Sequence, residues 1–199
     1  MKVLFLTNNI EISEKLFTWL SDKCRLTIFQ NKLDYEFLNR ESPNLVISYN
    51  YKYIINNSVL SYGCEFINLH ISFLPYNRGM HPNVWSFIEG TPKGVTIHRI
   101  DEGLDTGPIL IQKEVFFDED KETLRSSYLK LHEVMFNLFV ENWENIKNNK
   151  IIPFPQKDGG TIHYKKDFEE KIAPLIKDIG WDIKISELKK RYKEAYESV

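Results

Sequence analysis

The run FINLHISFLPYNRGMHPNVWSF, residues 66–87, contains the features that decide the fold of this chain. It opens with an apolar, strand-like segment in which Asn68 and His70 stand two positions apart. Because side chains alternate between the two faces of a strand, Asn68 and His70 are expected on the same face. A strand that only fills a core needs no such pair at its end. The pattern therefore predicts a functional site where this strand ends.

Similar apolar runs on either side of this segment predict a sheet. Helical periodicity lies between and after them, most clearly in the apolar stripe of residues 122–147, with further helices expected near residues 12–20 and 185–198. Strands that alternate with helices predict an α/β fold: a Rossmann-like, mostly parallel sheet with helices on both faces. The expected strands are Lys2–Thr7, Arg25–Phe29, Asn44–Tyr49, Glu65–His70, Gly94–Ile100 and Ile109–Phe117.

Length and composition indicate a globular chain with an ordinary core. The chain has 199 residues, 42% hydrophobic and 27% charged, which suits one domain with a short C-terminal appendage. The character of the sequence changes after Pro155. We therefore expect a main domain over residues 1–155 and an extension over 156–199, which packs on that domain or forms a dimer contact.

Charge and cysteine content narrow the partners and the compartment. The formal net charge is −2, so nucleic acid is not expected as a partner. Two cysteines form no disulfide framework, and a reduced, cytoplasmic setting is predicted. No run approaches the ~20 apolar residues of a membrane span. No metal is expected, because no ligand set occurs at familiar spacing.

A second motif supplies an acidic partner for the Asn-His pair. The segment GVTIHRIDEGLDTGPIL, residues 94–110, predicts a strand followed by a loop that carries Asp101, Glu102 and Asp105 and turns at Gly103 and Gly107. If the two strands are neighbours, an Asn, a His and an Asp converge at one rim. Each residue alone also has a structural explanation, such as an Asp that serves its own turn.

Together the three side chains suit acyl transfer. Histidine exchanges a proton near neutral pH, and an Asp beside it holds the ring and favours its charged form. An Asn amide donates a hydrogen bond to an oxygen on which negative charge develops. No Ser or Cys lies in a nucleophile-elbow context. Transfer to an external amine is therefore favoured over a covalent acyl-enzyme.

Two segments, NLHISFLPYNRGMHPNVW and KGVTIHRIDEGLDTGPIL, resemble the formyltransferases that use 10-formyltetrahydrofolate. The resemblance is closest to short sugar N-formyltransferases and to the formylation domain of linear gramicidin synthetase. It implies the formyltransferase fold and a catalytic trio of Asn68, His70 and Asp105. It also implies a folate pocket lined by Tyr53, Ile54, Ile55, Ser72, Phe73, Leu74, Pro75, Asp101, Gly103 and Leu104.

For the acceptor, the resemblance implies the amine of a nucleotide-linked amino sugar from a surface-glycan or flagellin-glycan precursor. The segment LFLTNNIEISEKL lacks the glycines that a purine-pathway relative uses for phosphate, and about 50 residues after the long helix are few for a tRNA enzyme. Alternatives are a carrier-bound aminoacyl group, glycinamide ribonucleotide, or a catalytically silent folate-binding module. A monomer or homodimer is expected. The candidate acceptor contacts are Asn8, Asn77, Arg78 and His81.

Overall fold

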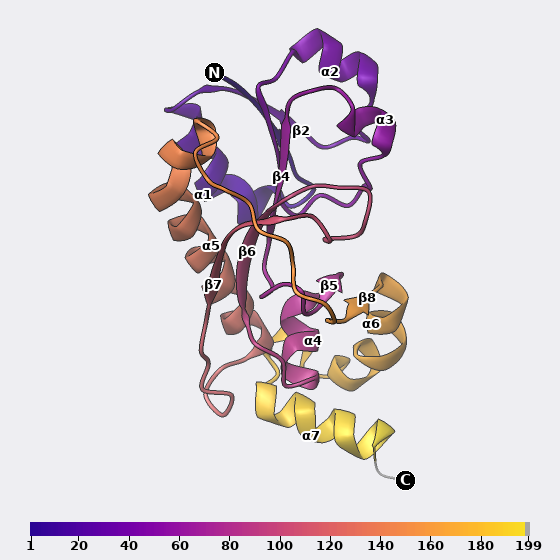
Figure 1. Cartoon of the computed structure of the whole chain (residues 1–199). Helices are drawn as coiled ribbons and strands as arrows, with labels where there is room; N and C mark the ends of the chain where they lie inside the picture. Colours follow the sequence, from indigo (N-terminus) through magenta and orange to yellow (C-terminus); the bar gives the residue numbers. More distant parts are fainter. Residues whose placement is uncertain (198–199) are drawn as a thin grey trace. The chain divides into compact units, whose positions relative to one another are not determined.

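The computed structural model describes residues 1–197 and contains a six-stranded, mostly parallel sheet (Figure 1). The strand order is β2-β1-β3-β4-β6-β7. Strand β1 pairs in parallel with β2 and β3, β3 pairs in parallel with β4, and β4 pairs antiparallel with β6. The strands are β1 (Lys2–Leu6), β2 (Arg25–Phe29), β3 (Leu45–Ser48), β4 (Glu65–His70), β6 (Gly94–Arg99) and β7 (Ile109–Glu114).

The predicted strands are confirmed, and the α/β class with them. The largest difference is in the last strand, which ends at Glu114 rather than Phe117. The helices expected near the N-terminus and after residue 122 are also present. The sequence reading missed the shorter elements, which lack the length for a clear period. The helices are α1 (Ile10–Ser21), α2 (Tyr35–Glu41), α3 (Asn57–Leu60), α4 (Pro82–Ile88), α5 (Leu124–Lys147), α6 (Lys165–Lys171) and α7 (Ile185–Tyr196).

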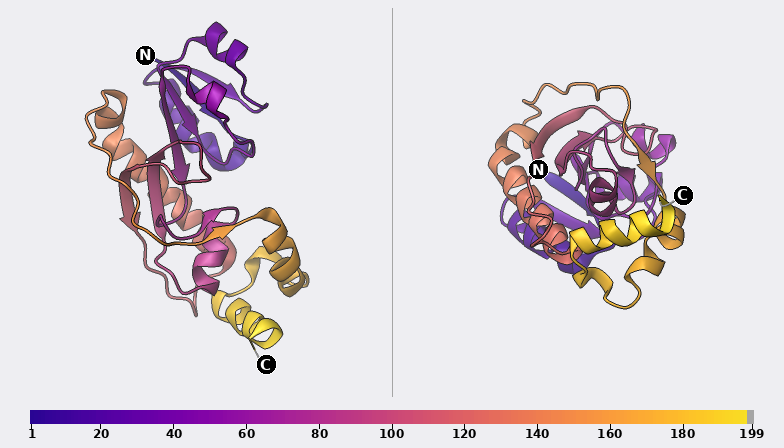
Figure 2. Two further views of the ribbon diagram at one scale, coloured as in Figure 1. Left: turned by 45° about the vertical axis from the view of Figure 1, so that its right-hand side comes forward. Right: turned by 90° about the horizontal axis from the view of Figure 1, so that it is seen from below.

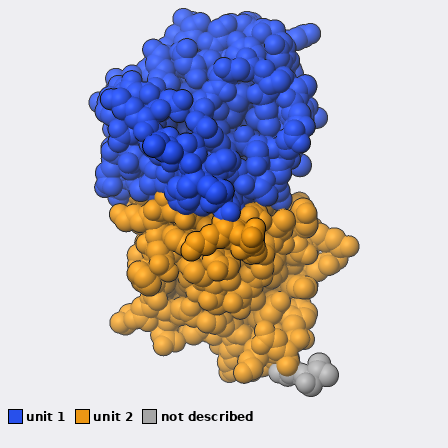
Figure 3. All heavy atoms as spheres, viewed as in Figure 1, with its two compact units in different colours: residues 1–70, 96–111, 136–156 blue, residues 71–95, 112–135, 157–199 orange. Residues whose placement is uncertain are grey.

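The chain forms two compact units, coloured separately in Figure 3. Unit 1 comprises residues 1–70, 96–111 and 136–156, and unit 2 comprises residues 71–95, 112–135 and 157–199. The division falls within β6, β7 and α5. It differs from the expected domains of 1–155 and 156–199, which remain a prediction.

Unit 1 covers its sheet on both faces. On one face, Leu4, Val46 and Phe66 of the strands pack with Leu38 of α2 and Val59 of α3 in a buried cluster. The other face is covered by α1 and the C-terminal half of α5, as the views in Figures 1 and 2 agree. Nearly continuous apolar strands are what a sheet buried on both faces requires.

Aromatic contacts fix the two helices on the second face. Phe5 of β1 meets Phe17 of α1 edge-on at 6.2 Å between ring centroids, and Trp19 of α1 meets Phe139 of α5 at 6.3 Å. Such edge-to-face pairs add about 0.5–1.5 kcal/mol to the burial of each ring. The apolar stripe predicted for the long helix is therefore a core face.

Unit 2 has a hydrophobic cluster of its own. Val84, Trp85 and Phe87 of α4 pack with Leu124, the start of α5, and with buried residues of the C-terminal segment. That segment contributes Ile172, Ile176, Ile183, Ile185 and Leu188. The short strands β5 (Arg78–Gly79) and β8 (Ile162–His163) pair in parallel, and the 3₁₀ helices η1 (Ala173–Ile176) and η2 (Gly180–Asp182) lead to α7.

The C-terminal helix α7 anchors the end of the described chain. It was expected over residues 185–198 and is observed over Ile185–Tyr196, while Ser198 lies outside the described residues. Its Ile185 and Leu188 are fully buried. Among residues 1–197, no helix combines the length and the apolar content that crossing a bilayer requires.

One buried histidine of α5 links the stability of unit 2 to pH. Burial lowers the pKa of His132 to about 3, whereas an exposed histidine titrates near 6.5. Between these values the unfolded chain binds a proton that the folded chain does not. The free energy of unfolding should therefore fall as the pH drops below 6.5, by up to about 1.4 kcal/mol per pH unit.

We predict that His132→Gln removes part of this acid sensitivity. Urea unfolding of the wild type and the variant at pH 7.5, 6.0 and 5.0 measures the effect. The difference in unfolding free energy between the two proteins should shift in favour of the variant as the pH falls. Parallel losses of stability in both proteins would show that other groups cause the acid sensitivity.

Candidate functional site

The candidate site begins with the register of two neighbouring strands. Asn68 of β4 lies directly opposite His98 of β6, and His70 lies opposite Thr96. Residues directly opposite one another in an antiparallel pair point to the same face. Asn68, His70 and His98 therefore share one face of the sheet, and His98 joins the pair predicted from the sequence.

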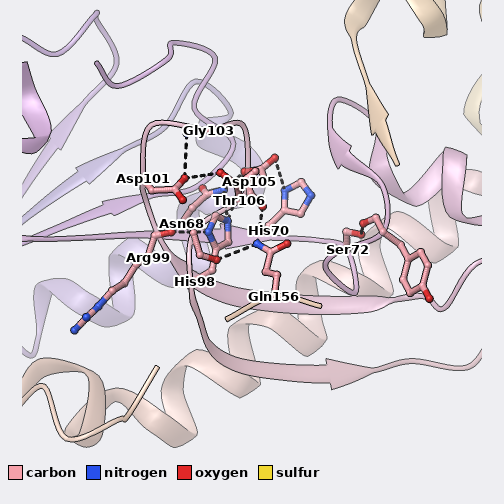
Figure 4. A network of polar contacts seen from close by, with 12 residues as sticks. Asn68, His70, Ser72, His98, Arg99, Asp101, Gly103, Asp105, Thr106 and Gln156 are labelled. Carbon is pink, nitrogen blue, oxygen red and sulfur yellow. Dashed lines mark hydrogen bonds and ion pairs between the residues drawn. The ribbon is translucent and has the colours of Figure 1, made fainter. Parts of the chain in front are cut away.

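Asp105 completes the cluster from the loop that follows β6 (Figure 4). Its Oδ1 accepts a hydrogen bond from Asn68 Nδ2 at 3.0 Å, and its Oδ2 lies 3.6 Å from His70 Nδ1. The side chains of Asp105 and His70 are only 11% and 8% exposed. The structure thus brings the three predicted residues together within unit 1, with a carboxylate at the centre.

The hydrogen bonds of His98 define its tautomer. Its Nδ1 lies 2.7 Å from the carbonyl oxygen of Arg99. A carbonyl only accepts, so Nδ1 carries the hydrogen. In the neutral ring the lone pair of Nε2 then accepts from Asn68 Nδ2 at 3.3 Å. The same Nε2 lies 3.5 Å from Asp105 Oδ1. Asn68 therefore donates one amide hydrogen to Asp105 and the other to His98, and its orientation is fixed by both partners.

The sequence suggested convergence at one rim, and the observed route is different. Since β6 runs antiparallel to β4, the loop after β6 leaves beside the beginning of β4, where Ile100 N donates to Phe66 O at 2.9 Å. The chain must fold back to bring Asp105 to Asn68. Asp105 adopts a left-handed conformation with φ of 53° to do so.

Two features inside the loop stabilise this return. Asp101 Oδ1 accepts from Gly103 N at 3.1 Å and from Thr106 Oγ1 at 2.6 Å, which closes a tight turn. Gly107 lies so close to the strand that a Cβ atom there would stand 1.9 Å from Arg99 O. Predicted folate contacts Asp101 and Gly103 thus also shape the loop that presents Asp105.

Sequence reasoning missed Gln156, which holds the same loop from outside. Its Nε2 donates to the carbonyl oxygens of Asp105 at 2.7 Å and Gly107 at 2.9 Å (Figure 4). The available signal was a polar residue in PFPQKDGG, a segment without periodicity. A single Gln in such a segment gives no indication of its partner 51 residues earlier.

The other predicted folate residues of unit 1 lie on the loop after β3. Ile54 is 78% exposed, an unusual state for a large apolar side chain, while Tyr53 is half-buried and Ile55 is buried. Leu104, on the loop of Asp105, is also half-buried. Exposed aliphatic and aromatic side chains of this kind suit contact with a flat ligand.

Asn8 was predicted as an acceptor contact, but both ends of its amide bind backbone. Its Nδ2 donates to Gln30 O at 2.7 Å, and its Oδ1 accepts from Lys52 N at 3.0 Å. Tyr51 supports the same loop by accepting from Leu33 N at 2.9 Å and donating to Asn31 O. Burial raises the pKa of Tyr51 to about 12. Asn8 therefore fastens the loop that carries Ile54.

In unit 2, the predicted residues that follow β4 are mostly covered. Ser72, Leu74 and Pro75 are buried, whereas Phe73 is half-buried. The Leu74–Pro75 peptide bond is cis. Gln112 Nε2 donates to Leu74 O at 2.6 Å. These residues thus form an ordered turn within unit 2.

Asn77 was predicted as an acceptor contact, and its amide makes hydrogen bonds inside unit 2. The residue is fully buried. Its Nδ2 donates to Glu89 Oε2 at 2.8 Å and its Oδ1 accepts from Thr91 Oγ1 at 2.7 Å. Its left-handed φ of 55° also explains why a residue that tolerates this region stands here. These bonds give Asn77 a role in ordering its loop, and its contact with an acceptor stays a prediction.

Arg78 and His81 remain acceptor candidates on unit 2. Arg78 is half-buried in β5. His81 stacks on Phe168 at 3.9 Å between ring centroids and is half-buried. Desolvation lowers the pKa of His81, an effect that nearby Glu169 opposes and Lys165 reinforces. Within residues 1–197, no group of three or more His, Cys, Asp or Glu is placed to hold a metal ion.

The comparisons with known proteins define the class of this α/β domain. The family model described as formyl transferase matches residues 25–142. The chain belongs to the formyltransferase family.

The chain is similar to formyltransferases whose names give different formyl acceptors. A crystal structure of the formyltransferase PseJ from Anoxybacillus kamchatkensis is 42% identical, with a TM-score of 0.85 over 94% of this chain and 97% of that chain. That structure is a complex with UDP-4,6-dideoxy-4-formamido-L-AltNAc and tetrahydrofolate.

Two curated relatives match over less of their length. The dTDP-4-amino-4,6-dideoxyglucose formyltransferase of Mycobacterium bovis is 35% identical over 65% of this chain and 55% of its own length. The methionyl-tRNA formyltransferase of Clostridium tetani is 35% identical over 77% of this chain and 48% of its own length. The chain therefore spans about half the length of these curated relatives.

We predict that Gly107→Ala displaces the loop of Asp105. The added Cβ would collide with Arg99 O, so the loop or the strand must shift, at a cost of about 1–3 kcal/mol. Thermal unfolding measures this cost, and amide hydrogen exchange of residues 101–107 reports the displacement.

Gly63→Ala is the matched control. Gly63 has open space for a Cβ but a φ of +92°, so its substitution tests backbone strain without a collision. It should leave exchange in residues 101–107 unchanged. Unchanged stability and exchange in Gly107→Ala would show that this close contact does not hold the loop.

Proposed function

We propose that this protein transfers a formyl group from 10-formyltetrahydrofolate to the amine of a nucleotide-linked amino sugar. One observation carries the choice of acceptor: the similarity to PseJ, whose complex holds a UDP-linked formamido sugar and tetrahydrofolate, extends over 97% of that chain. The Mycobacterium bovis relative, also named for a nucleotide-linked amino sugar, supports the same class. Surface-glycan or flagellin-glycan precursors contain sugars of this kind.

The Asn-His-Asp cluster supplies the groups that this transfer needs. The acceptor amine attacks the formyl carbon of the folate donor, and the tetrahedral intermediate collapses as the bond to the folate nitrogen breaks. That nitrogen takes up a proton, and tetrahydrofolate leaves. Asp105, 3.6 Å from His70 Nδ1, stabilises positive charge on that ring. His70 is thereby suited to receive the proton that the amine loses, directly or through a water held by Asp105, or to face a developing oxyanion.

Asn68 has a double role in this proposal. Its amide fixes the carboxylate of Asp105, and we propose it as a neutral donor to the carbonyl oxygen of the formyl group. Because both amide hydrogens bind protein acceptors in the structure, donation to the substrate requires that one of these bonds be shared. The weaker bond to His98, at 3.3 Å, is the one we expect to be shared.

The folate is proposed to pack on the side chains predicted for its pocket. In unit 1 the exposed Ile54 and the half-buried Tyr53 and Leu104 fit a flat ring system. Arg78 is proposed to pair with the diphosphate of the acceptor, and His81 to contact the acceptor nearby. We also infer a cytoplasmic setting, which the two free cysteines, Cys24 and Cys64, support.

A mass-spectrometric turnover assay tests the proposal. It supplies 10-formyltetrahydrofolate with UDP- and dTDP-linked 4-amino sugars, 3-amino sugars as regiochemical controls, and glycinamide ribonucleotide and methionyl-tRNA as competing acceptors. We expect one formyl group to be added to a sugar nucleotide. Product on methionyl-tRNA or glycinamide ribonucleotide alone would reject the sugar acceptor, and folate binding without any product would indicate a silent folate-binding module.

We predict that Asn68→Ala and His70→Ala each lower kcat about 10²- to 10³-fold, because each removes a group that meets charge in the transition state. Asn39→Ala, on the exposed surface of α2, serves as the control and should keep wild-type turnover. If the folded variants Asn68→Ala and His70→Ala both keep a kcat near that of the wild type, the proposed mechanism is wrong.

A further inference from the structure

Gln156 lies in the irregular segment between α5 and β8, and it ties the loop of Asp105 to the rest of unit 1. Two residues before it, Phe154 exchanges two backbone hydrogen bonds with Ile109, at 2.8 and 2.9 Å. The side-chain amide of Gln156 then donates to Asp105 O and Gly107 O. Both hydrogens of one side chain are thus used on two carbonyls of a single loop.

We infer that Gln156 is a positioning residue of the transfer reaction, and that it acts through Asp105. This inference rests on the proposed function. The carbonyl that Gln156 binds belongs to the same residue as the carboxylate that holds Asn68 and faces His70. A fixed backbone at Asp105 therefore fixes the position of the Cα atom from which its carboxylate extends.

The loop needs such an external tie. Asp105 adopts a left-handed conformation with φ of 53°, which is less favourable than right-handed backbone for an L-residue. Glycines at positions 103 and 107 add conformational freedom on either side. The turn closed by Asp101 orders residues 101–106, but it makes no bond to the carbonyls of Asp105 or Gly107. Gln156 holds both of these groups.

Other side chains of the site do not duplicate this role. His98 binds Asn68 and its own strand, and its Nε2 lies 3.5 Å from the carboxylate of Asp105 rather than from the backbone that Gln156 holds. Thr106 binds Asp101. Loss of Gln156 should therefore leave Asn68 and His70 in their positions on β4, while Asp105 moves. The expected kinetic signature is a lower kcat with little change in KM, because misplacing one catalytic group by about 1 Å costs up to ~10²-fold in rate.

The test uses two substitutions in the chain of residues 1–199. Gln156→Met removes both donors at similar size, and Gln156→Glu keeps the shape but presents only acceptors to the two carbonyls. We expect kcat to fall about 10- to 100-fold in Gln156→Met and further in Gln156→Glu, with KM for both substrates within about threefold. Gln30→Met, an exposed glutamine of unit 1, is the control and should match the wild type.

A double-mutant cycle asks whether the effect passes through Asp105. In the Asp105→Ala background, Gln156→Met should change kcat less than about twofold, because the group that it positions is already absent. If the full 10- to 100-fold loss persists in that background, or if Gln156→Met raises KM and leaves kcat unchanged, the inference is wrong.

Hydrogen exchange separates this inference from the proposed function, because it needs no acceptor. In Gln156→Met, amides of residues 101–107 should exchange faster than in the wild type, while those of β3 stay unchanged. Equal exchange in residues 101–107 would overturn the inference whatever the activity. A wild-type protein that formylates no acceptor would overturn the proposed function and leave the exchange result valid.

Discussion

The carboxylate of Asp105 is the group on which the site depends. One oxygen holds the amide of Asn68, and the other faces the ring of His70. Removing a nearly buried carboxylate leaves its donors without partners, and such groups cost about 1–3 kcal/mol each. The same contacts that satisfy the polar atoms of this face therefore arrange its chemistry.

The antiparallel strand β6 explains why so much of the loop is specialised. In a fully parallel sheet the carboxyl end of β6 would lie beside that of β4. Here it lies at the opposite end, and residues 101–107 must return along the sheet. Asp101, Gly107 and Gln156 each serve that return in a different way. In exchange, the antiparallel register places His98 opposite Asn68, where it fixes the second amide hydrogen.

Much of this architecture follows from local patterns in the sequence. Continuous apolar runs predicted the six strands, and alternation placed Asn68 and His70 on one face. The antiparallel direction of β6 could not be predicted, because an apolar run has the same pattern beside a parallel and beside an antiparallel strand. Gln156 was hidden for a related reason: its partners are fixed by the closed loop and not by nearby residues. For Asn8 and Asn77 the sequence did not reveal the hydrogen bonds that their amides make within the protein, because the partners are distant in the sequence.

The late position of Gln156 in the chain has a consequence for biosynthesis. Every strand of the sheet precedes residue 115, so the emerging polypeptide contains the whole sheet and the trio well before the glutamine is added. Synthesis proceeds at about 5–20 residues per second, which leaves an interval of seconds in which Asp105 lacks its outer tie. If Gln156 positions Asp105 as inferred, competence for transfer would arise only after residue 156 has been added to the growing chain.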